Sequence, residues 1–311
     1  MNSPSSLQHA QPQKTDGFAA PSLWKVSRPR FWMYVFGPYI VGLVAGAPSV
    51  ESLWDWRALA FAVFWTLPAN LFIYGVNDVH DFETDSRNRK KESYEARLER
   101  QQQRALLRTV WLLVLPFCAL ALLFAGARAT ACLAGFFAFA YAYSAPPVRA
   151  KARPLLDSAF NILYVFPAWF GHALAGGSGF WLTGVLAAWC WVAAMHAYSA
   201  VPDISADQDA HVDTIATHLG GTRTLLVCLG LYTASAALSF PALGALSLFL
   251  GLIYGALMLL SIRAGSEEAV LQIYKYFPLI NTFAGFCLFW RVALLQFPEL
   301  LGTPLDALLK R

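Results

Sequence analysis

The chain has 311 residues, of which 57% are hydrophobic and 14% are charged, and its formal net charge is +4. Soluble globular domains contain roughly 25% charged residues, so this composition and the mean hydropathy of +0.47 indicate a membrane protein. They exclude disordered, collagen-like, coiled-coil and disulfide-scaffold proteins, and the small net charge gives no reason to expect a nucleic-acid partner.

Nine apolar runs are close to the roughly 20 residues that a helix needs to cross a bilayer. They cover residues 31–48, 58–76, 105–125, 129–146, 155–177, 180–200, 222–240, 242–262 and 276–297. The strands of a membrane β-barrel are about 10 residues long and alternate in polarity, which these runs do not. We therefore expect an all-α integral membrane protein with nine transmembrane helices in one bundle. The five cysteines lie singly inside these runs and are expected to be small buried hydrophobic residues.

Basic residues predict the orientation in the membrane. Of the 23 Lys and Arg, 17 fall on the face that receives the N-terminus and the loops after the second, fourth, sixth and eighth runs. This bias predicts a cytoplasmic N-terminus in the cytoplasmic (inner) membrane. Residues 1–22 are polar, without the apolar stretch of a secretory signal, and are expected to be a flexible cytoplasmic tail.

The acidic residues gather in two loops. Eleven of the 19 Asp and Glu follow the second and sixth runs, both on the face predicted to be cytoplasmic. In the first cluster, Asp78, Asp81 and Asp85 share one face if the second helix continues, and Asn77 lies beside it. Three stacked carboxylates repel one another unless a cation lies among them. Such oxygen ligands suit Mg²⁺, which usually binds together with substrate phosphates.

The second acidic cluster begins at Asp203. Asp207 lies one helical turn further on, so both side chains are expected to face one way. Two such clusters would hold metal ions on both sides of a diphosphate. For either cluster alone, a solvent-facing acidic loop is an equally good explanation, but their occurrence on the same face favours the metal hypothesis.

Basic residues follow the acidic ones. The segment from Tyr143 to Lys151 closes the fourth run, and its two prolines predict the end of a helix and an extended chain. On such a chain, Arg149 and Lys151 point the same way and would bind phosphate oxygens. Lys91, after the first acidic cluster, is a further candidate. For Arg89 and Arg153, the orientation bias alone explains why a basic residue occurs there.

Three motifs together resemble the UbiA superfamily of intramembrane prenyltransferases. They are Asn77-Asp78-x-x-Asp81-x-x-x-Asp85, Tyr143-Ser-x-Pro-Pro-x-Arg149-x-Lys151 and Asp203-x-x-x-Asp207. The resemblance covers about residues 22–297 and implies a UbiA-like domain over 23–300 with a short tail, 301–311. It further implies a bundle around a central cavity, Mg²⁺ as cofactor, an allylic prenyl diphosphate as donor and a hydrophobic acceptor that enters from the bilayer.

The resemblance also implies roles for individual residues. The implied metal ligands are Asp78, Asp81, Asp85, Asp203 and Asp207. The implied diphosphate-binding residues are Arg28, Asn77, Lys91, Arg149 and Lys151. The implied catalytic residues, on a site that faces the cytoplasm, are Asp78, Asp81, Asp203, Tyr143 and Lys151.

Within the superfamily, the segment from Tyr74 to Asp81 is similar to the lycopene elongases, which make C50 carotenoids. The segments 200–204 and 213–217 are similar to the same branch. This similarity implies transfer of a C5 unit from dimethylallyl diphosphate to lycopene or a related carotenoid. One alternative is a UbiA-type enzyme with an aromatic acid, a quinone precursor or a chlorophyll-like alcohol as acceptor. A polytopic cation transporter is an alternative of another class, although transporters usually place their ion ligands near the bilayer midplane.

The remaining candidates are less specific. Aromatic rings that would stabilise a carbocation near the cytoplasmic ends are Phe72, Tyr74, Tyr141, Tyr143, Tyr164 and Tyr198. Helix packing and interfacial belts use the same residues. His80 and His196 lie near the motifs, but neither is identified as the terminal base. Polar residues at membrane depth usually face the bundle interior, and here they are Asn70, Asp157, Asn161, Asn281 and Arg291.

Overall fold

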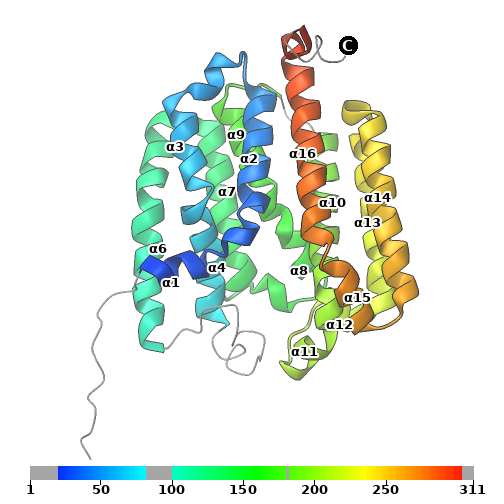
Figure 1. The fold of residues 1–311 in the computed structure, drawn as a ribbon. Helices are drawn as coiled ribbons and strands as arrows, with labels where there is room; N and C mark the ends of the chain where they lie inside the picture. Colours follow the sequence, from blue (N-terminus) through cyan, green and yellow to red (C-terminus); the bar gives the residue numbers. More distant parts are fainter. Residues whose placement is uncertain (1–19, 82–99, 180–181, 303–311) are drawn as a thin grey trace, which may run out of the picture.

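The computed structural model describes residues 20–81, 100–179 and 182–302, and within these ranges the only regular elements are helices (Figure 1). The helices of the first half are α1 (Ala20–Val26), α2 (Met33–Gly46), α3 (Trp56–Phe64), α4 (Leu67–His80), α6 (Arg100–Leu120), α7 (Ala127–Ser144), α8 (Leu156–Ala159) and α9 (Phe166–Leu174). Those of the second half are α10 (Leu182–Ala200), α11 (Ile204–Asp209), α12 (Ile215–Leu219), α13 (Gly221–Leu243), α14 (Ala245–Ala264), α15 (Glu267–Tyr274) and α16 (Phe277–Gln296). Short 3-10 turns connect several of them, and a π turn over Ala121–Ala125 extends α6.

Six helical segments of the described ranges are long and apolar enough to cross a membrane. They are Trp56–His80, Gln103–Ala125, Leu182–Asp209, Gly221–Leu243, Ala245–Ala264 and Glu267–Gln296, and α2 is a shorter apolar helix. The prediction of an all-α membrane bundle is confirmed. Each of the nine predicted runs overlaps helical residues, but α7 and the stretch from α8 to α9 are not among the six. The count of nine spans and the orientation therefore stay predictions.

Two of the predicted runs are divided by a break. The chain leaves the helical conformation at Thr66, and Pro68 in the first turn of α4 then restarts it, so that α3 and α4 are separate helices. The predicted continuous run 155–177 is wrong in detail, because it consists of α8, a 3-10 turn over Phe160–Tyr164, and α9. Pro167 at the start of α9 lacks the N–H that a continuous helix requires, which accounts for the break before α9.

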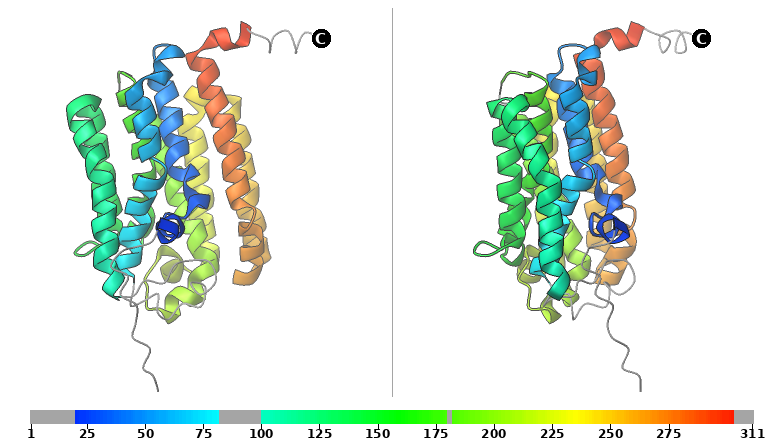
Figure 2. Two further views of the ribbon diagram at one scale, coloured as in Figure 1. Left: turned by 60° about the vertical axis from the view of Figure 1, so that its left-hand side comes forward. Right: turned by 90° about the vertical axis from the view of Figure 1, so that its left-hand side faces the viewer.

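The buried side chains form two main clusters. The first cluster contains residues of α2, α3, α4, α6, α7 and α9, and it includes the large aromatic residues Phe61, Phe64, Trp65, Phe136 and Phe170. The second joins α10 to α16. The long helices of both halves run side by side along the same axis (Figures 1 and 2). The bundle therefore has two packed halves.

Glycines bring α2 and α9 unusually close together. A methyl group on Gly42 would overlap the backbone carbonyl of Ala168, and one on Gly171 would overlap the carbonyl of Tyr39. Close helix contacts through small residues are typical of membrane bundles, where association depends on van der Waals packing. This contact fixes the position of α2, which carries part of the site described below.

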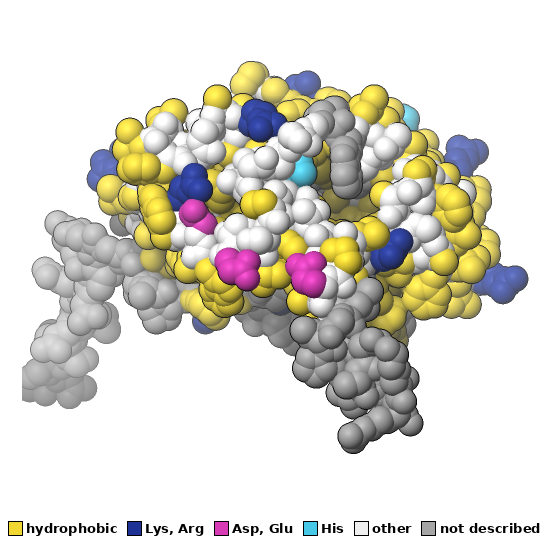
Figure 3. All heavy atoms as spheres, turned by 90° about the horizontal axis from the view of Figure 1, so that it is seen from above, with side chains coloured by type: hydrophobic (Ala, Val, Ile, Leu, Met, Phe, Trp, Pro, Cys, Tyr) yellow, Lys and Arg dark blue, Asp and Glu magenta, His cyan; other side chains and the backbone are white. Residues whose placement is uncertain are grey.

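The sides of the bundle are apolar. Seen along the bundle axis, hydrophobic side chains surround much of the molecule (Figure 3). The most exposed include Leu112, Leu122, Leu252, Leu279 and Phe286, all more than 60% accessible. Such a surface is stable against lipid tails and unfavourable in water.

The two acidic motifs lie at the same end of the bundle. The C-terminus of α4 and helices α11 and α12 lie at this end, which we call the motif end (bottom of Figure 1). The turn between α2 and α3 and the C-terminus of α16 lie at the opposite end. Both motifs follow helices that run toward this end, α4 and α10, so the two motifs lie at one end of the bundle although they are far apart in sequence (Figure 1).

Candidate active site

Arg28 forms the first charged contact of the motif end. Its Nη2 atom donates to Oδ1 of Asp78 at 2.8 Å, and its guanidinium lies 4.7 Å from the centre of the Tyr74 ring. Tyr74 and Asp78 are one turn apart on α4, so one arginine contacts both. Asp78 is only 4% exposed, and a carboxylate so deeply buried requires a charged partner. The left-handed backbone of Arg28 (φ 48°) turns the chain from α1 toward α2 at this position.

Lys151 forms the second charged contact. Its Nζ atom donates to Oδ1 of Asn77 at 2.8 Å and is ion-paired with Asp81. Nη2 of Arg149 lies 3.6 Å from the same carboxylate of Asp81, and Ser144 at the end of α7 donates to Asn77 at 3.1 Å. In the part of the chain that the structure describes, Arg28, Arg149 and Lys151 therefore contact the carboxylates of Asp78 and Asp81.

The chain around Lys151 differs from the sequence prediction. A 3-10 turn over Ala150–Ala152 carries Lys151, and Arg149 before it has a left-handed backbone, so the predicted extended segment is wrong. The turn hydrogen bonds from Arg149 to Ala145 and from Ala152 to Arg149 fold this segment locally. Both side chains nevertheless reach the first motif, as predicted for a pair that binds one group.

The first acidic motif is less regular than a continued helix. Helix α4 ends at His80, and Asp81 follows as its C-cap residue. Asp78 and Asp81 consequently contact different cations rather than stacking on one face. Asp85 and Lys91 lie outside the described residues, so their predicted roles stay predictions.

The second motif lies at the junction of α10 and α11. Asp203 ends the 3-10 turn Val201–Asp203, and Asp207 lies in α11, so both are positioned at the motif end. Within the described ranges, no three His, Cys, Asp or Glu side chains come together in a metal-binding group. The predicted shell of five carboxylates therefore stays a prediction.

The individual donors fit the ion that the motifs imply. Asn77, Asp78 and Asp81 present amide and carboxylate oxygens, the ligand type that Mg²⁺ prefers. Asp78 is also buried, and its ion pair with Arg28 compensates its charge in this position.

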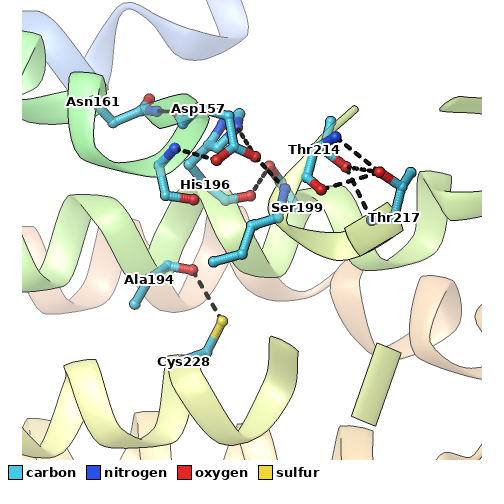
Figure 4. A network of polar contacts seen from close by, with 10 residues as sticks. Asp157, Asn161, Ala194, His196, Ser199, Thr214, Thr217 and Cys228 are labelled. Carbon is cyan, nitrogen blue, oxygen red and sulfur yellow. Dashed lines mark hydrogen bonds and ion pairs between the residues drawn. The ribbon is translucent and has the colours of Figure 1, made fainter. Parts of the chain in front are cut away.

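Asp157 connects α8 to the loop that follows the second motif (Figure 4). Its side chain is fully buried and accepts the backbone N–H groups of Ser158 and Ile215, each at 2.7 Å. Nε2 of His196 lies 3.8 Å from the same carboxylate. Ile215 opens α12, where Thr214 and Thr217 form a reciprocal capping box. Asp157 therefore holds the start of α12, which follows the segment with Asp203 and Asp207, a role that its position in an apolar run did not reveal.

A large apolar cavity lies between the two halves of the bundle. Its volume is about 1010 Å³, and its walls come from α2, α9, α10, α13, α14 and α16. It extends along α2 from Met33 to Ala45, a distance of about 18 Å at the helical rise. Tyr34 and Tyr164 line it, with ring centres 6.5 Å apart.

Aromatic rings connect this cavity to the charged contacts. Phe31 lies 6.0 Å from Tyr34 and 6.1 Å from Tyr74, measured between ring centres, and Tyr74 lies beneath Arg28. We call Phe31, Tyr34, Tyr74 and Tyr164 the aromatic cluster. Two of its members, Tyr34 and Phe31, were not among the sequence candidates, because only the approach of α2 to α4 and α9 places them here.

Other sequence candidates lie elsewhere. Phe72 packs in the core against Trp111 and Phe137, and Tyr198 packs against Tyr274 and Phe277. Tyr141 is 43% exposed. Asn70 donates to the carbonyl of Thr66, the N-cap residue of its own helix, as a packing residue does. Tyr143 lies beside His196, with ring centres 5.9 Å apart, between the first motif and Asp157.

A lipid-facing helical bundle with a charged site next to a long apolar cavity is the arrangement of an integral membrane enzyme for an amphiphilic substrate. The chain belongs to the UbiA prenyltransferase family, whose sequence profile matches residues 35–273. The protein is therefore a prenyltransferase, and the cation-transporter alternative is excluded.

Curated relatives and solved structures agree with this assignment. A lycopene elongase/hydratase of Halobacterium salinarum is 39% identical over 263 residues, which cover 85% of this chain and 94% of that protein. One of Haloferax volcanii is 38% identical and covers 84% of both chains. The structure of a UbiA homologue from Archaeoglobus fulgidus bound to DMAPP and Mg²⁺ has a TM-score of 0.56 and 21% identity, over 86% of this chain and 99% of that one. The similarity to the Archaeoglobus fulgidus structure shows that the two chains share a fold.

Proposed function

We propose that this prenyltransferase transfers the C5 unit of dimethylallyl diphosphate to lycopene or a related linear carotenoid, in a Mg²⁺-dependent reaction of C50 carotenoid biosynthesis. The observation that carries the proposal is the long apolar cavity, which adjoins the charged contacts through the aromatic cluster. A linear hydrocarbon acceptor fits such walls, because it has no polar group to leave unpaired. The names of the relatives support the choice of carotenoid.

The chain's own residues are assigned as follows. The ion would be held by Asp78, Asp81, Asp85, Asp203 and Asp207, and when bound it stabilises negative charge on the diphosphate. Arg28, Asn77, Lys91, Arg149 and Lys151 would bind the diphosphate oxygens. Arginine and lysine donors directed at a leaving group stabilise its developing charge most strongly where water is excluded.

The reaction proceeds through an allylic cation. The C–O bond of the donor breaks, and its electron pair leaves with the diphosphate. The terminal double bond of the acceptor forms a bond to the allylic carbon, and the cation left on the acceptor then loses a proton or adds water. Faces of aromatic rings attract a cation by roughly 0.5–2 kcal/mol each. Tyr74 and Tyr164 of the aromatic cluster, and Tyr143 beside the first motif, would take this role. The motif end, with its excess of Lys and Arg, would face the cytoplasm.

The test is the release of diphosphate by purified protein in detergent with dimethylallyl diphosphate, lycopene and Mg²⁺. We expect Asp78→Asn and Asp203→Asn, as well as chelation of the metal, to lower the rate by about hundredfold or more, the scale for removing a catalytic electrostatic contact. Asp209→Asn, an exposed neighbour of the second motif, is the matched control and keeps the rate. Release only with longer donors, or only with aromatic acceptors, would overturn the carotenoid proposal.

A further inference from the structure

A chain of hydrogen bonds crosses the apolar cavity and joins three helices. The Tyr254 hydroxyl on α14 donates to Oδ1 of Asn281 on α16 at 2.9 Å, and Nδ2 of Asn281 donates to the Tyr34 hydroxyl on α2 at 2.9 Å. All three residues line the cavity. Asn281 is 5% exposed and Tyr254 is 3% exposed, so the chain lies deep inside the bundle.

The direction of these bonds determines which group remains available. Because the Tyr34 oxygen accepts from Asn281, the Tyr34 hydroxyl proton is not used in this chain. Among residues 20–81, 100–179 and 182–302, the Tyr34 hydroxyl makes no other hydrogen bond. The buried hydroxyl of Tyr232, which lines the same cavity and whose ring stacks on Tyr254 at 4.6 Å, also has no protein partner within these ranges.

The polar groups of Tyr34, Tyr254 and Asn281 in the wall of an apolar cavity require an explanation. Amide and hydroxyl groups at membrane depth are costly unless they are hydrogen-bonded, and they usually mark a functional site. A hydrocarbon acceptor offers them no partner. A buried water molecule typically makes two to four hydrogen bonds. The Tyr34 hydroxyl can supply one of them, and the second amide hydrogen of Asn281, which the chain of hydrogen bonds does not use, can supply another.

The position of Tyr34 relates the chain to the reaction. Tyr34 belongs to the aromatic cluster and contacts both Tyr164 and Phe31, and Phe31 contacts Tyr74 beneath Arg28. The polar chain therefore ends at the side of the cavity nearest the charged contacts, where the C5 unit joins the acceptor in the proposed function.

We propose that Tyr34 and Asn281 hold the water molecule that adds to the carbocation left on the acceptor after C5 transfer. This inference rests on the proposed function and deepens it by assigning residues to the water addition that the relatives' name, elongase/hydratase, describes for them. Bond formation between the allylic carbon and the acceptor's double bond leaves a tertiary cation on the acceptor. The water oxygen forms a C–O bond to that carbon, and the excess proton leaves with the diphosphate released in the same turnover. Without a held water, the cation instead loses a proton and gives an additional double bond.

The experiment compares the products of Tyr34→Phe and Asn281→Leu with those of the parent chain in heavy-oxygen water. We expect the parent to form an elongated product with one labelled hydroxyl per added C5 unit. In both variants, the ratio of hydroxylated to alkene product should fall by about tenfold or more, the factor that corresponds to 1.4 kcal/mol, while diphosphate is still released.

Tyr39→Phe is the matched control. Tyr39 lies on the same helix, and its fully buried hydroxyl donates to the Ala58 carbonyl at 2.7 Å, outside the cavity. Its product ratio should equal that of the parent. A parent that forms only alkene, or variants that keep the hydroxylated fraction, would overturn the water site and leave the proposed function intact. A folded parent that releases no diphosphate would instead contradict the proposed function itself.

Discussion

Arg28 contacts the buried carboxylate of Asp78 and the ring of Tyr74 at once, so it helps to set the charge of the site before any ligand binds. The pairs Arg28–Asp78 and Lys151–Asp81 each join a cation assigned to the diphosphate with a carboxylate assigned to the metal. Arrival of a metal diphosphate would offer both partners a new contact of opposite charge. The cations are therefore held in place at the position where they are needed, which limits the cost of ordering them on binding.

Removing the positive charge of Arg28 should weaken donor binding. Arg28→Gln is expected to raise the KM for dimethylallyl diphosphate by about tenfold or more, since hydrogen bonds to charged groups contribute about 1.5–3 kcal/mol. Arg28→Lys should recover part of this loss. Steady-state kinetics of diphosphate release measure the effect, with the exposed Arg153→Gln as the control. An unchanged KM in Arg28→Gln would remove Arg28 from the site.

Asp157 links α8 to α12, because its carboxylate accepts the backbone N–H at the start of α12. Asp157→Asn retains one acceptor oxygen and should leave one buried N–H unpaired, which costs about 1–3 kcal/mol of unfolding free energy. Thermal unfolding in detergent measures this loss. Asp209→Asn, on the exposed surface, should show no change, and an equal loss in both variants would contradict the assigned role of Asp157.

At the scale of helices, the contact between α2 and α9 positions Tyr34 and the wall of the cavity. Gly42→Ala places a methyl group against the backbone of Ala168, which cannot move aside as a side chain does. Overpacking of this kind should destabilise the protein by about 1–3 kcal/mol or more. Gly230→Ala on α13 meets no atom within 4 Å and gains helix propensity, so its melting temperature should be unchanged or slightly higher. A Gly42→Ala protein as stable as its parent would show that α2 and α9 do not cross at this point.

The sequence predicts individual helices better than their contacts. Apolar runs of suitable length predict α6, α10, α13, α14 and α16, because hydrophobicity and length suffice for a membrane helix. The break at Thr66 and the division of the run 155–177 depend on single prolines and local hydrogen bonds, which composition does not show. Arg28 with Asp78, and Tyr34 with Asn281, are 50 and 247 residues apart, so only the packing of the bundle brings them together.

At the scale of the whole molecule, the two ends of the bundle should face different compartments. Glu51 is exposed and lies in the turn between α2 and α3, at the end opposite the motifs (Figure 1). Asp209 is exposed and ends α11, at the motif end (Figure 1). In a chain whose five native cysteines are replaced by alanine, we expect a membrane-impermeant maleimide to label Glu51→Cys in intact cells. Asp209→Cys should react only after the membrane is opened. The reverse pattern would contradict the cytoplasmic orientation of the active site.

The most direct test of the central claim is the mass of the carotenoid that the protein makes. Purified protein, lycopene, dimethylallyl diphosphate and Mg²⁺ are incubated together, and the carotenoids are extracted and analysed by mass spectrometry. The account predicts products heavier by one or two C5 units, with or without water added to each, and their loss in Asp78→Asn. Lycopene recovered unchanged, while the same protein releases diphosphate with another acceptor, would contradict it.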